Sequence, residues 1–249
     1  MGELTGKVAW VTGAGGGIGE AGAEAMAASG AHVVLTGRRA AELERVKSEI
    51  EAAGGKAETL ALDVTDREAV EAAAKDLGDR LGGVDVLLAN AGMNVPNRDT
   101  GSLTNTDFAQ VMDVNVNGVM YGVMAVLPQM RAKGGGLVMM VSSWAGRHAS
   151  KLTGPAYNAS KHAVVALSHS INQEEAANGV RSCVIMPGEV NTPIMEKRPV
   201  PPPPEMRAKM LQPEDMGRLI RFVAESPAHV CLNEILISPT HNRLFVSAS

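Results

Sequence analysis

Cysteine is scarce in this chain of 249 residues, which contains only Cys183 and Cys231. Two isolated cysteines cannot build the three- or four-ligand sites that zinc requires, so no metal site is predicted. Both cysteines stand in apolar stretches. We therefore expect them to be buried free thiols in a reducing compartment, the cytoplasm.

Long apolar runs, basic charge and aromatic side chains are scarce as well. No run approaches the ~18 to 20 apolar residues of a membrane span, and the N-terminal segment MGELTGKVAWVTG lacks the basic-then-apolar layout of a signal peptide. The net charge of −4 argues against nucleic-acid binding, which needs a basic face. With three phenylalanines and two tyrosines in the chain, no aromatic cage for a substrate is expected.

The chain does show a regular alternation of two kinds of segment. Apolar, β-branched runs predict strands at 8–11, 32–36, 57–62, 84–89, 137–141, 180–186 and 235–237. Runs of helical periodicity predict helices at about 17–29, 40–53, 65–81, 104–131, 156–178 and 213–225. Because the strands are almost continuously apolar, a parallel sheet covered by helices on both faces is expected. The predicted fold is a single α/β domain over 1–249, a doubly wound (Rossmann) sheet of seven parallel strands.

A glycine-rich stretch, VTGAGGGIGEA, joins the first strand to the first helix. Such a turn lets a phosphate approach the backbone N–H groups at the start of a helix. Gly13, Gly17 and Gly19 are the glycines that the turn needs, and the pattern is T-G-x-x-x-G-I-G from Thr12 rather than G-x-G-x-x-G. A flexible loop without a ligand is the alternative for this stretch alone.

The end of the second strand bears on which dinucleotide is bound. An NAD-binding fold usually places an acid about 20 residues after the glycines, for the ribose 2′-hydroxyl. Gly37 stands there instead, and the guanidinium groups of Arg38 and Arg39, which follow, can bind a 2′-phosphate. We therefore expect NADP(H) rather than NAD(H), the alternative being that both arginines are merely solvated. Asp63, after the third strand, is expected to accept from the adenine amino group or to cap a helix.

Three polar residues predict a reacting centre. Ser143 ends the fifth strand, and Tyr157 and Lys161 lie four residues apart on one face of the next helix. A neighbouring ammonium lowers the pKa of a tyrosine from its usual value near 10, as a proton donor to a carbonyl oxygen requires. Ser143 would hold the same oxygen by a hydrogen bond. A Tyr-x-x-x-Lys pair by itself occurs by chance in many proteins.

Taken together, these motifs resemble those of the short-chain dehydrogenases/reductases, in their shorter single-domain form, over roughly residues 4–240. The resemblance implies an oxidoreductase that transfers hydride between a nicotinamide and a carbonyl or secondary alcohol, with Tyr157 as acid–base. Lys161 would also bind the nicotinamide ribose, and Asn115 would hold a water that links Lys161 to solvent. The other residues implied to border the cofactor are Thr12, Ile18, Val64, Asn90, Ala91, Gly92, Pro187, Gly188 and Thr192.

The resemblance also places the substrate between the loop after Ser143 and a segment at about 188–212. Prolines at 199 and 201–204 predict a stiff, extended chain in this segment. The candidate substrate contacts are Asn94, Trp144, His148, Glu189 and Met195. For His148 the alternative is a surface position, and for Glu189 it is a loop cap.

Helices at 107–131 and 156–178 form the dimer bundle in this family, so a homotetramer or a homodimer is expected. The leading hypothesis is an NADP(H)-dependent carbonyl reductase or alcohol dehydrogenase acting on a small molecule. A 3-oxoacyl-thioester reductase shares every catalytic residue and stays open. From another class, a nucleotide-sensing protein of the same fold usually lacks the tyrosine or the lysine, and both are present here.

Overall fold

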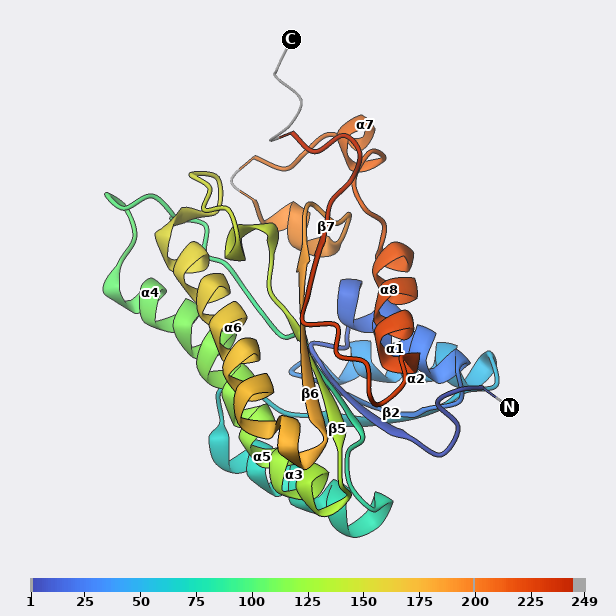
Figure 1. Cartoon of the computed structure of the whole chain (residues 1–249). Coiled ribbons are helices and arrows are strands. Elements are labelled where there is room, and N and C mark those ends of the chain that lie inside the picture. Colours follow the sequence, from blue (N-terminus) through green and yellow to red (C-terminus); the bar gives the residue numbers. More distant parts are fainter. Residues whose placement is uncertain (1, 199, 244–249) are drawn as a thin grey trace.

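The computed structural model describes residues 2–198 and 200–243, which form the predicted seven-stranded sheet (Figure 1). All neighbouring strands are parallel, in the order β3-β2-β1-β4-β5-β6-β7. The strands are β1 (Val8–Thr12), β2 (His32–Gly37), β3 (Lys56–Ala61), β4 (Val86–Ala89), β5 (Gly136–Val141), β6 (Val180–Pro187) and β7 (Glu234–Ile237). The order reverses between β1 and β4, and a sheet of this kind binds its ligands at the carboxyl ends of the strands beside that point.

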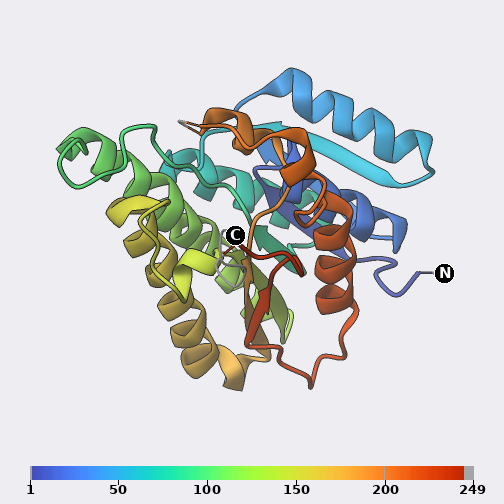
Figure 2. The ribbon, with the colours of Figure 1, turned by 90° about the horizontal axis from the view of Figure 1, so that it is seen from above.

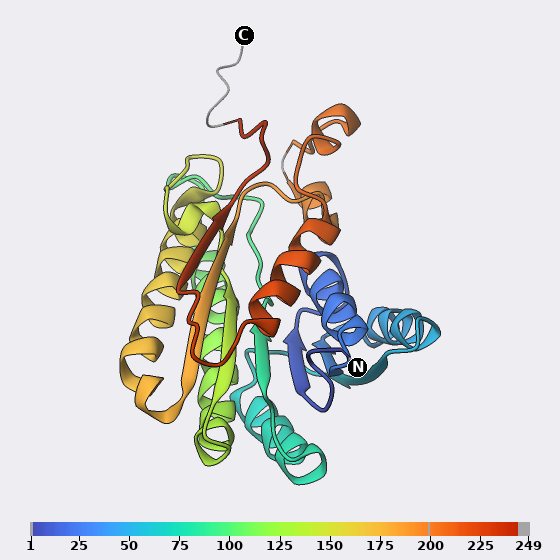
Figure 3. The ribbon, with the colours of Figure 1, turned by 45° about the vertical axis from the view of Figure 1, so that its right-hand side comes forward.

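Helices cover both faces of the sheet (Figure 3). One face carries α1 (Gly17–Ala28), α2 (Ala40–Ala52) and α8 (Pro213–Glu225), and the other carries α3 (Arg67–Leu81), α4 (Asn105–Met112), α5 (Gly118–Ala132) and α6 (Gly154–Glu175). The apolar stripe of α2 faces inward, with Leu43, Val46 and Ile50 buried, as their helical spacing predicts. The cap of α3 is Asp66, whose carboxylate accepts from the Ala69 amide.

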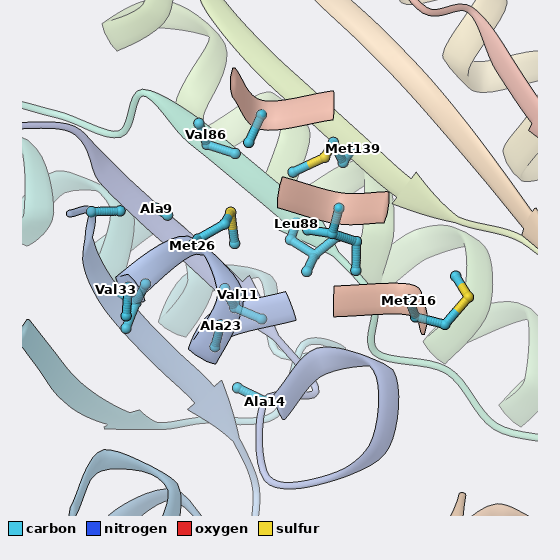
Figure 4. Close-up of a cluster of buried hydrophobic side chains, with 14 of the residues drawn as sticks. Ala9, Val11, Ala14, Ala23, Met26, Val33, Val86, Leu88, Met139 and Met216 are labelled. Atoms are coloured by element: carbon cyan, nitrogen blue, oxygen red, sulfur yellow. The ribbon is translucent and has the colours of Figure 1, made fainter. Parts of the chain in front are cut away.

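The core beneath α1 and α8 fixes the helix that follows the glycine turn (Figure 4). Two glycines let these helices approach each other and the sheet. A Cβ at Gly22 would lie 2.8 Å from Leu88 Cδ2, and one at Gly217 would lie 2.7 Å from the carbonyl oxygen of Ala21. The buried side chains around them include Ala9, Val11, Ala23, Met26, Val33, Val86, Met139 and Met216. The start of α1 is thus held in place by dense packing.

The helix predicted from Thr104 to about 131 is continuous, because neither Gly118 nor Pro128 interrupts it. A π-helical turn (Asp113–Asn117) joins α4 to α5. The side chain of Thr104 caps the N-terminus of this continuous helix. Over Asn105–Ala132 this helix is long and apolar enough to cross a membrane by length and composition alone, a test that core helices of soluble proteins also pass. Polar residues interrupt its apolar positions, so the sequence shows no unbroken apolar run here. The cytoplasmic location stays a prediction.

The proline-rich segment is less uniform than predicted. A 3₁₀ turn (Pro193–Lys197) and the short helix α7 (Pro204–Arg207) lie in it, and Pro204 starts α7 because proline suits the first helical position. Residues 201–203 have no regular structure, and Pro199 lies outside the described residues. The segment lies above the carboxyl ends of the strands, near the chain that follows β7 (Figures 1 and 2).

The two cysteines differ in exposure. Cys183, on β6, is buried as predicted, and burial raises its pKa to about 12. Cys231 is exposed, so the prediction that it is buried was wrong. It lies in the loop between α8 and β7, where the adjacent Leu232 packs against the core while Cys231 itself stays exposed.

Candidate active site

A cavity of about 550 Å³ opens at the carboxyl ends of the strands, the end that Figure 2 views from above. All residues predicted to bind the cofactor line this cavity except Thr12 and Gly19, and so do Ser143, Tyr157 and Lys161. Loops that follow β1 to β6 contribute to its wall. The predicted site residues, scattered along the sequence, are therefore brought to a single cavity.

The glycine turn makes room at one side of this cavity. Gly13 and Gly17 have φ values of +66° and +61°, which side-chain-bearing residues rarely adopt. A Cβ at Gly17 would lie 3.0 Å from Cγ2 of Thr192, another residue that lines the cavity. A Cβ at Gly19 would collide with the carbonyl oxygen of Gly13, so Gly19 serves the packing of helix on turn rather than the cavity.

Thr12 and Asn90 tie the two strand ends that flank the reversal of strand order. The Thr12 hydroxyl accepts from the backbone amides of Asn90 at 3.0 Å and Ala91 at 3.1 Å. In return, Asn90 Nδ2 donates to the carbonyl oxygens of Thr12 and Gly13. Thr12 is only 6% exposed, so it supports the turn from behind and does not face the cavity.

Arg38 and Arg39 lie beside the glycine turn with largely exposed side chains. Arg39 Nη2 donates to the carbonyl oxygen of Gly15 at 3.2 Å, and Arg38 Nη1 lies 3.7 Å from Asp63 Oδ2. Asp63 also accepts from Thr65, and Asp66 caps α3, so the helix-cap alternative for Asp63 was wrong. The positive charge that the glycine turn itself lacks is supplied by these two arginines.

Ser143, Tyr157 and Lys161 meet where β5 ends and α6 begins. Lys161 is 4% exposed and donates from Nζ to the carbonyl oxygen of Val141 at 2.9 Å. Its Nζ lies 5.5 Å from the centroid of the Tyr157 ring. Ser143 accepts from the amide of Ala145 and hydrogen-bonds with Tyr157, which places both hydroxyl groups at one point of the wall.

The titration of this group departs from the sequence prediction. Burial raises the pKa of Tyr157, although Ser143 and the positive charges of Arg198 and Arg98 act to lower it. Burial also lowers the pKa of Lys161 to about 8. The predicted depression of the tyrosine pKa by Lys161 is therefore not observed, because desolvation dominates for both groups.

Asn115 lies behind the cavity wall, fully buried in the π-helical turn. Its amide oxygen accepts from the Met93 amide at 2.7 Å, and its Nδ2 donates to the Met93 carbonyl and to Ser160 Oγ. A Cβ at Gly92 would lie 3.3 Å from both Asn115 Oδ1 and Lys161 Nζ. The side chain is thus fixed on the same side of Gly92 as Lys161, and its role in holding a water stays a prediction.

Of the candidate substrate contacts, His148 alone lies off the cavity. It is exposed, and its ring contacts that of Trp144 with centroids 5.0 Å apart, so the surface alternative holds. Trp144, Met195 and Asn94 line the cavity, and Asn94 Nδ2 also donates to the Thr153 carbonyl. Asn94 therefore joins two loops of the wall.

Three arginines in the wall escaped the sequence analysis: Arg98, Arg198 and Arg243. Glu189 binds two of them, accepting from Arg198 Nη1 at 2.6 Å and from Arg243 Nε at 2.8 Å. Burial opposes the ionisation of Glu189, but these hydrogen bonds outweigh it and lower its pKa. The arginines come from three separate loops without any regular spacing, so no sequence pattern connects them.

The wall fits a dinucleotide. Glycine lets the turn pack closely against Asn90, Ala91 and Thr192, and no side chain caps the backbone N–H groups at the start of α1, which lies beside this cavity. In the part of the chain that the structure describes, the one cluster of three potential metal ligands is Glu20, Glu24 and Glu49. Arg45 binds Glu20 and Glu49 of that cluster, which lies on α1 and α2 and takes no part in the cavity wall.

Comparison with known proteins places this site in a family. The sequence profile of the short chain dehydrogenases matches residues 7–201. A glycine betaine reductase of Emericella nidulans is 38% identical over 96% of this chain, although the match spans only 19% of that larger protein. An uncharacterized oxidoreductase of Staphylococcus aureus strain MW2 is 34% identical over 96% of this chain and 100% of its own length.

A solved structure shares the architecture over almost the whole chain. An alcohol dehydrogenase from the archaeon Thermococcus sibiricus, in complex with 5-hydroxy-NADP, superposes with a TM-score of 0.85 and 30% identity, covering 95% of this chain and 98% of the other. The profile match and the full-length relatives agree with the geometry of the cavity. The chain belongs to the short chain dehydrogenase family and is an NAD(P)-dependent oxidoreductase of CH–OH and C=O groups.

Proposed function

We propose that the protein is an NADP(H)-dependent carbonyl reductase or alcohol dehydrogenase with Tyr157 as its acid–base. One observation carries the proposal: the glycine turn after β1 and the Ser143–Tyr157–Lys161 group line the same cavity. The strand order puts β2 and β3 on one side of β1 and β5 and β6 on the other side of β4. A dinucleotide that follows this order would reach from Arg38 and Arg39 to Tyr157.

The residues of the reacting centre divide the chemistry between them. Ser143 and Tyr157 hold the carbonyl oxygen, and Tyr157 gives that oxygen its proton as the carbonyl carbon is reduced. A reduced nicotinamide, when bound, supplies the hydride. Lys161 binds the nicotinamide ribose, and Asn115, packed beside it, completes the path by which the proton is replaced.

The preference for NADP(H) is supported by the charges beside the glycine turn. Arg39 reaches the Gly15 carbonyl and Arg38 lies next to Asp63, so both guanidinium groups border the place expected for the adenosine ribose. A 2′-phosphate would add charge-assisted hydrogen bonds to them. The similar alcohol dehydrogenase, which holds 5-hydroxy-NADP, lends the proposal further support.

A turnover screen tests the proposal. Aldehydes, ketones, oxo acids and 3-oxoacyl thioesters are each mixed with the enzyme and NADPH or NADH, and the loss of reduced-nicotinamide absorbance is followed. We expect turnover of one carbonyl class with NADPH preferred. Thioester activity alone would favour the 3-oxoacyl-thioester reductase, and nucleotide binding without turnover in either direction would favour a nucleotide-sensing protein.

We also propose that the protein assembles as a homotetramer. Large apolar side chains are exposed on two separate surfaces: Phe108 and Met124 on the α4–α5 helix, and Phe222 and Leu236 on α8 and β7. If each surface pairs with its counterpart on another copy about its own twofold axis, the two pairings generate a closed tetramer. Light scattering on the purified protein measures the mass, and a monomer would contradict the proposal.

A further inference from the structure

The wall of the cavity near Tyr157 carries an excess of positive charge. Arg98, Arg198 and Arg243 line it there, and the one acid among the described residues at this end is Glu189. The other lining acid, Asp63, lies at the nucleotide end beside Arg38. The substrate end of the cavity therefore carries a net positive charge from its arginines alone, and Lys161 is a further basic group there.

Arg198 is fixed at this wall by one hydrogen bond of its guanidinium group, and other N–H donors of that group are left for a ligand. Its side chain is 14% exposed, and Nη1 donates to Glu189 Oε1 at 2.6 Å. Arg243 takes both oxygens of the same carboxylate, so one acid is shared between two arginines. The remaining N–H groups of Arg198 have no hydrogen-bond partner among residues 2–198 and 200–243, and a guanidinium has five such donors.

Arg98 lines the same cavity from another loop, and no acid within residues 2–198 and 200–243 forms an ion pair with it. Its Nε donates to the Val95 carbonyl at 2.9 Å and its Nη1 to the Leu152 carbonyl at 3.3 Å. Its backbone packs against the first residue of α6, where a Cβ at Gly154 would collide with the Arg98 carbonyl. The fold thus anchors Arg98 to the helix that carries Tyr157.

Both arginines line the same cavity as Tyr157, and their charges act on each other and on the phenol. Burial and the charge of Arg198 lower the pKa of Arg98, and both arginines act to lower the pKa of Tyr157. Holding two like charges together in a partly desolvated wall is unfavourable unless an anion offsets it. A planar guanidinium binds carboxylate and phosphate oxygens in particular.

We infer that the substrate of the proposed reductase carries an anionic group, a carboxylate or a phosphate monoester, a few bonds from the reacting carbonyl. Arg198 and Arg98 bind this group, while Glu189 is a positioning residue that fixes Arg198 through their shared hydrogen bond. The inference rests on the proposed function, because it names the substrate class of that same site. Small oxo acids and short phosphorylated aldehydes satisfy it.

The experiment compares carbonyl compounds that carry an anionic group with neutral partners in which that group is esterified or absent. Malonic, succinic and glutaric semialdehydes are each assayed with NADPH against their methyl esters, and glycolaldehyde phosphate against glycolaldehyde. We expect kcat/KM for the anion to exceed that of its neutral partner by about tenfold or more, chiefly through KM. The series with the larger ratio of anion to neutral kcat/KM shows whether the anionic group is a carboxylate or a phosphate. Equal rates within each pair, or a preference for betaine aldehyde, which is a cation, would overturn the inference.

Variants assign the effect to the arginines. Arg198→Met or Arg98→Met should lower kcat/KM for the anion by roughly 10- to 100-fold more than for the ester. Arg198→Lys should restore part of the loss, and Glu189→Gln should raise KM for the anion alone. The control is Arg67→Met, on α3 with a 63% exposed side chain, which should change neither substrate. Equal losses for anion and ester would overturn the inference.

The outcomes distinguish a failure of the anionic-substrate inference from a failure of the proposed reductase function. Turnover of the neutral esters without any preference for the anions would overturn the inference and leave the reductase standing. No turnover of any compound with either nucleotide would count against both. Circular dichroism of each variant shows whether a loss reflects binding or folding, and Arg98→Met provides an independent test if Arg198→Met does not fold.

Discussion

The two ends of the cavity use charge in different ways. At the nucleotide end, Arg38 and Arg39 have side chains that are 69% and 71% exposed. At the reacting end, Lys161 is 4% exposed and the Arg198 side chain 14%. Water screens the first pair, whereas the second pair is held in a desolvated wall where interactions between charges are stronger.

The difference in exposure between the two ends indicates different roles for exposed and buried basic residues. An exposed arginine adds selectivity for a phosphate at little cost to stability, because it is solvated whether or not the ligand is bound. A buried lysine or arginine needs fixed partners, which the fold supplies through the Val141 carbonyl for Lys161 and through Glu189 for Arg198. The largest effects of substitution are therefore expected at the reacting end.

The first prediction concerns stability and pH. The pKa of Lys161 is about 8 in the folded protein and ~10.4 in an unfolded chain. Between these values the unfolded chain binds more protons, so the free energy of unfolding rises with pH, by roughly 3 kcal/mol. Below about pH 8 the full penalty of the buried ammonium remains, and above ~10.4 it is gone.

Urea denaturation between pH 7 and 11 measures this rise as the difference between the unaltered protein and Lys161→Met. The difference is needed because burial also raises the pKa values of Cys183 and Tyr157, which lowers the unfolding free energy of both proteins as pH rises. Lys161→Met should lack the rise, and Lys75→Met, whose lysine is 77% exposed on α3, should retain it. If Lys161→Met and the unaltered protein show the same slope of unfolding free energy against pH, Lys161 does not titrate as a buried group, and the contrast between the two ends fails.

A smaller effect is expected at the nucleotide end. Replacing both Arg38 and Arg39 by alanine should raise the dissociation constant of NADPH by about tenfold and that of NADH by less than about twofold. Fluorescence titration of each reduced nucleotide measures both constants, with Arg67→Ala as the matched surface control. Equal weakening of NADPH and NADH would mean that these arginines do not bind the 2′-phosphate.

Much of the nucleotide end, together with the Tyr157–Lys161 pair of the reacting end, could be predicted because these determinants are local in sequence. The glycines of the turn, the two arginines after β2 and the Tyr157–Lys161 spacing each lie within one element or its adjoining turn. Strand and helix bounds followed from apolar periodicity, as for α2 and β6. The family itself was correctly identified from these motifs, as the profile match confirms.

The substrate end could not be predicted because its geometry depends on distant loops. Arg98, Arg198 and Arg243 converge only when the loops after β4, β6 and β7 fold over the sheet. The same holds for the pKa of Tyr157, where burial in the cavity outweighs the effect of the neighbouring charges. The four-residue spacing in α6 predicts that Tyr157 and Lys161 lie on one face of the helix. It does not predict how deeply the fold buries them.

The central claim, that Tyr157 is the proton donor of a nucleotide-dependent reductase, is tested most directly by Tyr157→Phe. Turnover with NADPH and the dissociation constant of NADPH are measured on the same preparation. We predict that turnover falls by roughly 10²- to 10⁴-fold, while NADPH binding changes by less than about threefold, because only the phenol oxygen is removed. A variant that retains about a tenth or more of the turnover would contradict the account.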